Sequence, residues 1–80
     1  LAALVDRHAA ALVLYARQWT HAPDDVVQAA FVRLAAAGAR PADPAAWLYR
    51  VVRNAALDAA RADRRRKKHE ATAAGRAAPW

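Results

Sequence analysis

The sequence predicts an all-α domain, a compact bundle of three helices with a long C-terminal helix. Hydrophobic residues make up 58% of the 80-residue chain, and Ala, the best helix former, supplies more than half of them. Only two Gly and four Pro interrupt the chain. No stretch alternates apolar and polar residues with the period of two that a half-buried strand requires. A chain of this length forms one small domain at most.

The first helix is expected over residues 1–19, where apolar residues recur at spacings of three and four. This stripe consists of Leu1, Val5, His8, Leu12, Tyr15 and Trp19, and it is widened by Leu4, Ala11 and Ala16. No second metal ligand stands at helical spacing from His8, so we interpret this histidine as a core or boundary residue.

The second helix is expected over residues 23–37. It begins with Pro23, has two Asp in its first turn and stops at Gly38 as a C-cap glycine. Its core stripe is Val27, Ala30, Phe31 and Leu34, and its opposite face is Asp25, Gln28, Ala29, Val32 and Ala35. That opposite face is less polar than a solvated surface. It is either a protein-docking surface or one side of a weakly amphipathic Ala-rich helix.

The third helix is expected to start after the loop 39–42, with Asp43 as N-cap and Pro44 in the first turn. Its predicted buried stripe is Leu48, Val52, Ala55, Ala59 and Ala62, and its other face carries Arg50, Asn54, Asp58, Arg61 and Arg65. This helix is either a nucleic-acid recognition element or an amphipathic helix with a solvated charged face. We expect residues 1–70 to form the domain and residues 71–80 a flexible tail or truncated linker.

The composition argues against several classes of protein. There is no Cys for a disulfide or a thiolate metal site, and the three His are scattered. There is no Ser and only one Glu, so we expect no enzyme, no metal and no cofactor. No apolar run approaches membrane-spanning length, and the N-terminus lacks the layout of a signal peptide.

The net charge is +6, and its distribution is uneven. Residues 1–40 carry four Arg against three Asp, whereas residues 41–80 carry nine Lys and Arg against four acidic residues. This asymmetry predicts a polyanionic partner for the C-terminal half, or a basic tail.

The segments DDVVQAAFVRL at 24–34 and AWLYRVVRNAALDAARADRRRKK at 46–68 resemble region 2 of bacterial sigma factors of the extracytoplasmic-function (ECF) group. The resemblance covers residues 4–68. It depends on the composite of D-x-x-Q-x-x-F, WLYR, RN and D-x-x-R in this order. It implies a cytoplasmic promoter-recognition module of RNA polymerase holoenzyme, which binds the β′ subunit and promoter DNA and can also be held by an anti-sigma factor.

By this resemblance, the second helix docks on the coiled coil of the β′ clamp. Asp25 and Gln28 match the family's polar contact positions, while Ala29 stands where an acidic residue is common. The implied polymerase-binding positions are Asp25, Gln28, Ala29 and Val32. The loop and the long helix would engage the −10 promoter element and hold an unpaired base. The implied DNA-binding positions are Arg40, Asp43, Trp47, Arg50, Arg53, Asn54, Arg61, Arg64 and Arg65.

The sequence leaves two interpretations open for some side chains. Asn54 either contacts a base edge or bonds Asp58 one turn away, and Trp47 either packs or stacks on a base. Asp58 is expected to pair with Arg61 or Arg65. Asp63 is expected to form a solvated pair with Lys67, and residues 64–68 contact phosphates or form a solvated tail.

The sequence also allows two alternative functions: a sigma-like protein-interaction module without DNA recognition, and a generic basic helical domain. The family's −35-binding region 4 does not occur in these residues, the chain begins at Leu1 without Met, and it ends at Trp80. We therefore expect an excised or processed fragment of a longer sigma factor.

Overall fold

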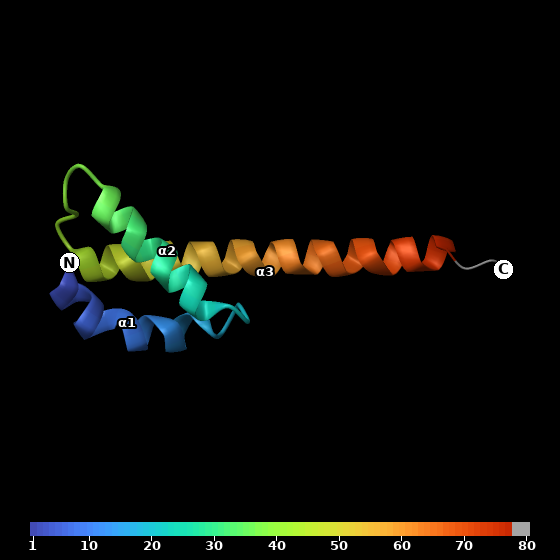
Figure 1. The fold of residues 1–80 in the computed structure, drawn as a ribbon, viewed down its shortest axis with the longest axis horizontal. Helices are drawn as coiled ribbons and strands as arrows, with labels where there is room; N and C mark the ends of the chain where they lie inside the picture. The colour runs from blue at the N-terminus through green and yellow to red at the C-terminus, as the bar shows by residue number, and fades with distance from the viewer. Residues whose placement is uncertain (78–80) are drawn as a thin grey trace.

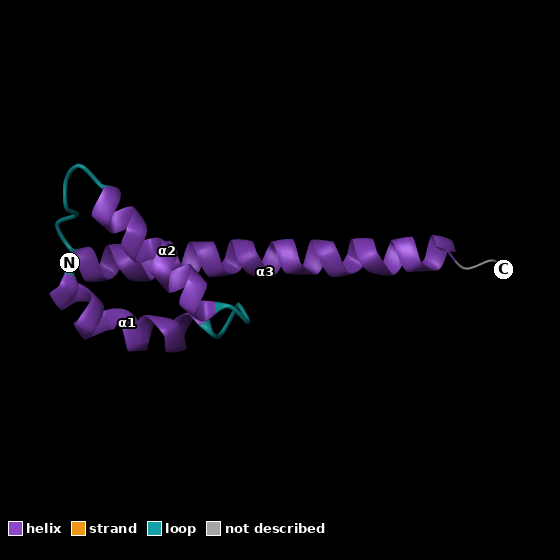
Figure 2. Cartoon of the chain, in the orientation of Figure 1, coloured by secondary structure: helices purple, strands orange, loops and turns teal. Residues whose placement is uncertain are grey.

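The computed structural model describes the backbone of residues 1–77 and the side chains of residues 1–72. This part of the chain forms three α-helices and no strand: α1 (Ala2–Ala16), α2 (Pro23–Ala36) and α3 (Pro44–Ala77) (Figures 1 and 2). The predicted all-α fold with a long C-terminal helix is thus confirmed.

The two short helices pack against the first half of α3, and α3 then continues alone beyond them (Figure 1). The molecule is therefore elongated, with principal extents of 59 × 24 × 16 Å. In the view of Figure 1, the N-terminus and the loop between α2 and α3 are at the same end of the bundle, opposite the projecting end of α3.

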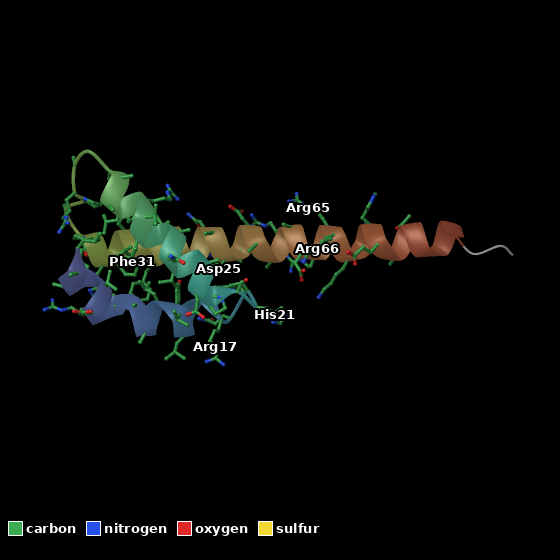
Figure 3. All side chains as sticks on the ribbon, viewed as in Figure 1. Arg17, His21, Asp25, Phe31, Arg65 and Arg66 are labelled. Atoms are coloured by element: carbon green, nitrogen blue, oxygen red, sulfur yellow. The ribbon has the colours of Figure 1, made fainter. Side chains whose placement is uncertain are left out.

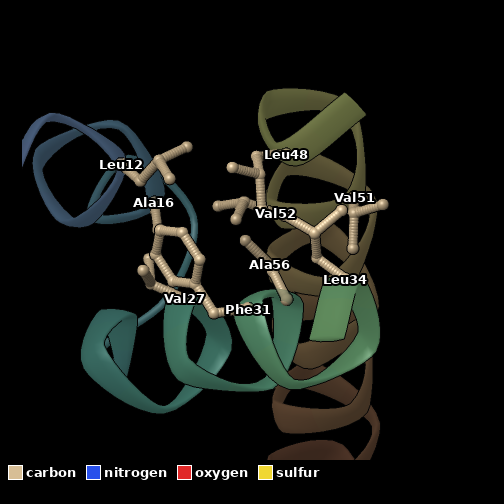
Figure 4. Packing of buried hydrophobic residues seen from close by; sticks show 10 residues of the cluster. Leu12, Ala16, Val27, Phe31, Leu34, Leu48, Val51, Val52 and Ala56 are labelled. Carbon is tan, nitrogen blue, oxygen red and sulfur yellow. The ribbon is translucent and has the colours of Figure 1, made fainter. Parts of the chain in front are cut away.

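The core is small and entirely apolar, and no polar or charged residue is buried in residues 1–72. Leu12, Leu48 and Val52 are its largest fully buried side chains, and Phe31 of α2 lies between α1 and α3 (Figure 4). Among the side chains of residues 1–72, ten are buried: Leu12, Ala16, Val27, Ala30, Phe31, Leu34, Leu48, Val51, Val52 and Ala56. The core stripe predicted for α2 is confirmed in full.

The core stripes predicted for α1 and α3 need correction. On α3, Val51 and Ala56 are buried and Ala62 is exposed, because α1 and α2 do not extend along the helix as far as Ala62. On α1, Leu1 is 44% exposed and Ala11 is exposed, since the buried side of this helix is the narrow strip of Leu12 and Ala16. His8 is half-buried, as expected for a boundary residue.

Two helix ends also differ from the prediction. The helix α1 ends at Ala16, and residues 17–19 form a turn in which the backbone N–H of Thr20 bonds the carbonyl of Ala16 at 3.2 Å. The helix α2 ends at Ala36, and Ala37 is already extended, with a ψ of 133°. The C-cap residue is Ala37, so the prediction of Gly38 as the C-cap glycine was wrong: Gly38 has no positive φ, and the chain leaves α2 in an extended conformation.

The start of α3 matches its prediction. The carboxylate Oδ1 of Asp43 accepts a hydrogen bond from the backbone N–H of Ala46 at 3.1 Å, which is the N-cap geometry, and Pro44 is the first helical residue. The helix continues through Ala77, so residues 71–77 of the expected tail are helical. Residues 78–80 lie outside the described part, and the division into a domain and a flexible tail stays a prediction.

Candidate nucleic-acid and protein interface

The outer face of α3 is the side that points away from the core. Arg50, Asn54, Arg61 and Arg65 are all exposed, whereas Leu48 and Val52 on the opposite side are fully buried. Successive residues of a helix are rotated by about 100°, so the spacings of four, seven and four place these four polar residues along one line. Arg53 and Arg64 are exposed on the flank of the same face. From Arg50 to Arg65 the line is about 22 Å long at 1.5 Å per residue.

The hydrogen bonds on this face decide between the two partners expected for Asp58 and between the two interpretations of Asn54. Asp58 pairs with Arg61 at 3.3 Å, not with Arg65, and both side chains are well exposed. Within residues 1–72, the side chain of Asn54 makes no hydrogen bond, so the expected alternative bond to Asp58 is not formed. Its carboxamide is therefore available to an outside partner.

The basic run 64–68 is partly neutralised by one carboxylate. Asp63 accepts bonds from Arg66 and from Lys67, whose Nζ lies 3.2 Å from Oδ2, and the predicted Asp63–Lys67 pair is confirmed. The hydrogen bond from Lys67, with the nearby charges of Lys67 and Arg66, lowers the pKa of Asp63. Arg65 and Arg66 point to different sides of α3 (Figure 3). Arg65 is left without an ion pair among the described residues, on the line of the outer face.

Trp47 lies in the first turns of α3, at the end of the bundle that holds the loop. It is half-buried and packs against the core, and the guanidinium of Arg33 on α2 lies 5.8 Å from the centroid of its ring. The packing interpretation of Trp47 is therefore favoured over free stacking on a base. Sequence reasoning missed Arg33, because no spacing pattern links residues 14 apart across a loop.

The loop between α2 and α3 brings its polar residues to the same end. Arg40 and Asp43 are exposed and Pro41 is half-buried. One oxygen of Asp43 is engaged in the N-cap bond, so this carboxylate has a structural task whatever else it contacts. The loop residues Arg40 and Asp43 and the outer face of α3 together form the candidate DNA-binding surface, and the structure brings all nine predicted DNA-binding positions to this loop and this helix.

The outer face of α2 is a second surface. Asp25, Gln28, Ala29 and Val32 are exposed, and with Arg33 they line a shallow depression of about 480 Å³. Val32 is 61% exposed, although it is a large apolar side chain. The predicted docking residues thus gather in one place, which we call the α2 depression, and Arg33 joins them.

Neither a bilayer-crossing segment nor a metal cluster appears among the described residues. No helix there combines the length and apolarity that a membrane span requires. No group of three or more His, Asp or Glu side chains there lies close enough together to hold a metal ion.

The sequence pattern of sigma-70 region 2 matches residues 4–66, which include α1 from Leu4 onwards, α2, the loop and α3 as far as Arg66. The chain belongs to the sigma-70 region 2 family. Region 2 is the part of sigma factors that binds RNA polymerase core and takes part in melting promoter DNA. All thirteen predicted site positions lie within the region 2 match. No curated protein and no solved structure matches the chain.

Proposed function

We propose that the chain is the region 2 domain of an ECF sigma factor. It recognises the −10 element and opens the strands with the loop and the outer face of α3, while the α2 depression docks on the β′ clamp of RNA polymerase. The observation that carries this proposal is the exposure of Arg50, Asn54 and Arg61 along one line of a helix whose other side is fixed in the core.

The cost of opening the DNA duplex is comparable in size with the free energy that stacking a captured base returns. Opening a duplex costs a few kcal/mol for each unstacked base, least at flexible TA or CA steps. Stacking a captured base returns about 1–3 kcal/mol. Each arginine that neutralises a phosphate adds about −0.7 to the slope of log K against log salt for a single strand. These cations attract any strand, so sequence preference has to come from groups such as the exposed carboxamide of Asn54.

The protein side follows from the α2 depression. Asp25 and Gln28 offer hydrogen-bonding groups, and Val32 offers apolar area in a surface position. Such a mixture of polar contacts around an exposed apolar side chain suits a helical partner. An anti-sigma factor that covers either surface would block the activity.

Selection from a library of random single strands, at fixed salt and with core polymerase present, tests the DNA part and does not require the promoter sequence. We expect the recovered strands to share a motif. Asn54→Ala should weaken the motif, whereas Arg64→Ala should reduce binding of every strand alike. Recovery of unrelated strands by the unmodified chain would remove the claim of sequence recognition.

A protein-interaction module without DNA recognition is the second candidate, and the exposure of Val32 favours it. Under this alternative, changing Gln28 or Val32 abolishes transcription-related activity, while Arg53→Ala and Arg61→Ala leave it intact. The opposite pattern supports promoter recognition. A basic helical domain for nucleic acid of any kind would bind RNA and DNA alike.

The remaining parts of the proposal concern the whole protein. We propose that it acts in the cytoplasm, where the polymerase works, and that it has no enzymatic activity of its own. The full open reading frame tests the ECF assignment, since a helix-turn-helix domain downstream would complete a sigma factor of this group.

A further inference from the structure

We propose that Arg33 is a positioning residue for promoter binding: it holds the indole of Trp47 and thereby fixes the entry of the DNA-binding helix. This inference rests on the proposed function of the outer face of α3, and it adds a residue on α2 to it.

Arg33 and Trp47 connect the two elements that enclose the loop. Arg33 lies in the last turn of α2, between the exposed Val32 and the buried Leu34, and its guanidinium is 5.8 Å from the ring centroid of Trp47. No carboxylate within residues 1–72 pairs with Arg33, so the indole ring is the partner that the structure gives its charge. A guanidinium in this position is attracted by the negative face of the ring.

Trp47 in turn belongs to the N-cap turn of α3. Its backbone N–H bonds the carbonyl of Asp43 at 3.1 Å, while the Asp43 carboxylate holds the N–H of Ala46. The side chain of Trp47 therefore sets where this turn sits on the bundle, and the loop residues are attached directly to it. Displacing the indole would shift this first turn and the loop attached to it, while Leu48 and Val52 keep the following turns in the core.

Arg33 is also part of the α2 depression, with Gln28 and Val32. A partner seated in this depression would cover the guanidinium, and loss of water strengthens a cation–π contact. Docking on α2 would then hold Trp47 more firmly, so one side chain connects the protein surface to the DNA surface.

The test compares Arg33→Met, which keeps a flexible unbranched stem but removes the guanidinium and its charge, with Arg17→Met as the matched control at the exposed C-cap of α1. In the free chain, we expect Arg33→Met to shift the indole N–H signal of Trp47 in a ¹H–¹⁵N spectrum, with Trp47→Phe identifying that signal among the three tryptophans. Arg17→Met should leave it in place. An unmoved Trp47 signal in Arg33→Met overturns the proposal.

Binding to a single strand recovered from the random library separates positioning from direct contact. We expect Arg33→Met to lower affinity about two- to fivefold, the size of an exposed cation–π contact, with an unchanged salt slope. The affinity of Arg33→Lys, which keeps a cation over the ring, should lie between those of the unmodified chain and of Arg33→Met. Arg53→Met, in contrast, should reduce the salt slope by about 0.7. Unchanged affinity, or a reduced slope in Arg33→Met, overturns the positioning role. If the unmodified chain binds no strand, the proposed function fails, and the indole signal still decides whether Arg33 holds Trp47.

Discussion

The rings of Tyr15 and Tyr49 meet edge to face, with centroids 5.1 Å apart and planes at 70°, and thereby join α1 to α3. Tyr15 also meets Trp19 in the same manner, at 5.0 Å. Tyr15, Trp19 and Tyr49, which we call the aromatic seam, lie on the flank of α3 towards α1. Arg33 and Trp47 instead join α3 to α2. The helix α3 is thus held from both sides by aromatic contacts.

A double-mutant cycle on the seam should show coupling between the two tyrosines. We expect Tyr15→Leu and Tyr49→Leu to lose less stability together than the sum of their separate effects, by about 0.5–1.5 kcal/mol. Urea unfolding followed by circular dichroism measures each variant. Strictly additive losses would mean that the edge-to-face geometry contributes nothing beyond buried area.

Replacing Asp43 should separate its structural task from any contact with DNA. Asp43→Ala removes the N-cap bond to Ala46 and should lower the free energy of unfolding by about 0.5–2 kcal/mol, whereas Asp43→Asn, an equally good cap, should change it little. Chemical denaturation measures both. If Asp43→Asn keeps full stability but alters strand binding, the carboxylate has a role in the interface as well, and equal destabilisation by both variants contradicts the cap.

Removing the acidic residue of the outer face should strengthen strand binding. Asp58→Asn frees Arg61 from a surface ion pair worth about 0.2–0.5 kcal/mol, so affinity should rise by up to about twofold. Asp6→Asn on α1 changes the net charge equally and leaves Arg61 paired, which makes it the matched control for a titration at low salt. The gain should disappear near 1 M salt, where the screening length is about 3 Å. Equal gains from both variants would assign the effect to net charge alone.

Acid should loosen the middle of α3 through Asp63. The pKa of this carboxyl is lowered in the folded chain, chiefly by the hydrogen bond from Lys67, so its stabilising effect is present above the ordinary carboxyl pKa and disappears as pH falls through the lowered value. Between pH 5 and pH 8, Asp63 therefore makes no pH-dependent contribution, and its loss should appear only below about pH 4. Helicity is measured against pH for the unmodified chain and for Asp63→Asn, and the difference between the two curves gives the contribution of the Asp63 carboxylate. A difference that changes around neutral pH would contradict the assignment.

Local signals were predictable from the sequence, and tertiary ones were not. The Asp43–Pro44 start of α3 and the exposed line through Arg50 and Asn54 follow from capping chemistry and helical period, which do not depend on neighbouring elements. The burial of Val51 instead of Ala62 depends on where α1 and α2 end in space, which no pattern within α3 records.

Two further differences have the same origin. Gly38 permits a left-handed turn, but the path of the loop towards Asp43 decides whether one forms. Arg33 and Trp47 meet only because α2 and α3 cross, so their contact has no sequence signature. For the same reason, the sequence pattern identified four residues of the α2 depression and yet omitted Arg33 from it.

Because α3 is unbroken from Pro44 to Ala77, Arg50 at the start of the exposed line and the basic run 64–68 lie on one continuous helix. The distance of about 22 Å along the helix from Arg50 to Arg65 equals the length of about six or seven nucleotides of one DNA strand, at 3.4 Å per nucleotide. One alanine inserted between Ala59 and Ala60 would turn every later side chain by about 100° relative to the buried residues of α3, which end at Ala56. The register between the two ends, as much as the identity of the side chains, therefore determines which groups one strand can meet at once.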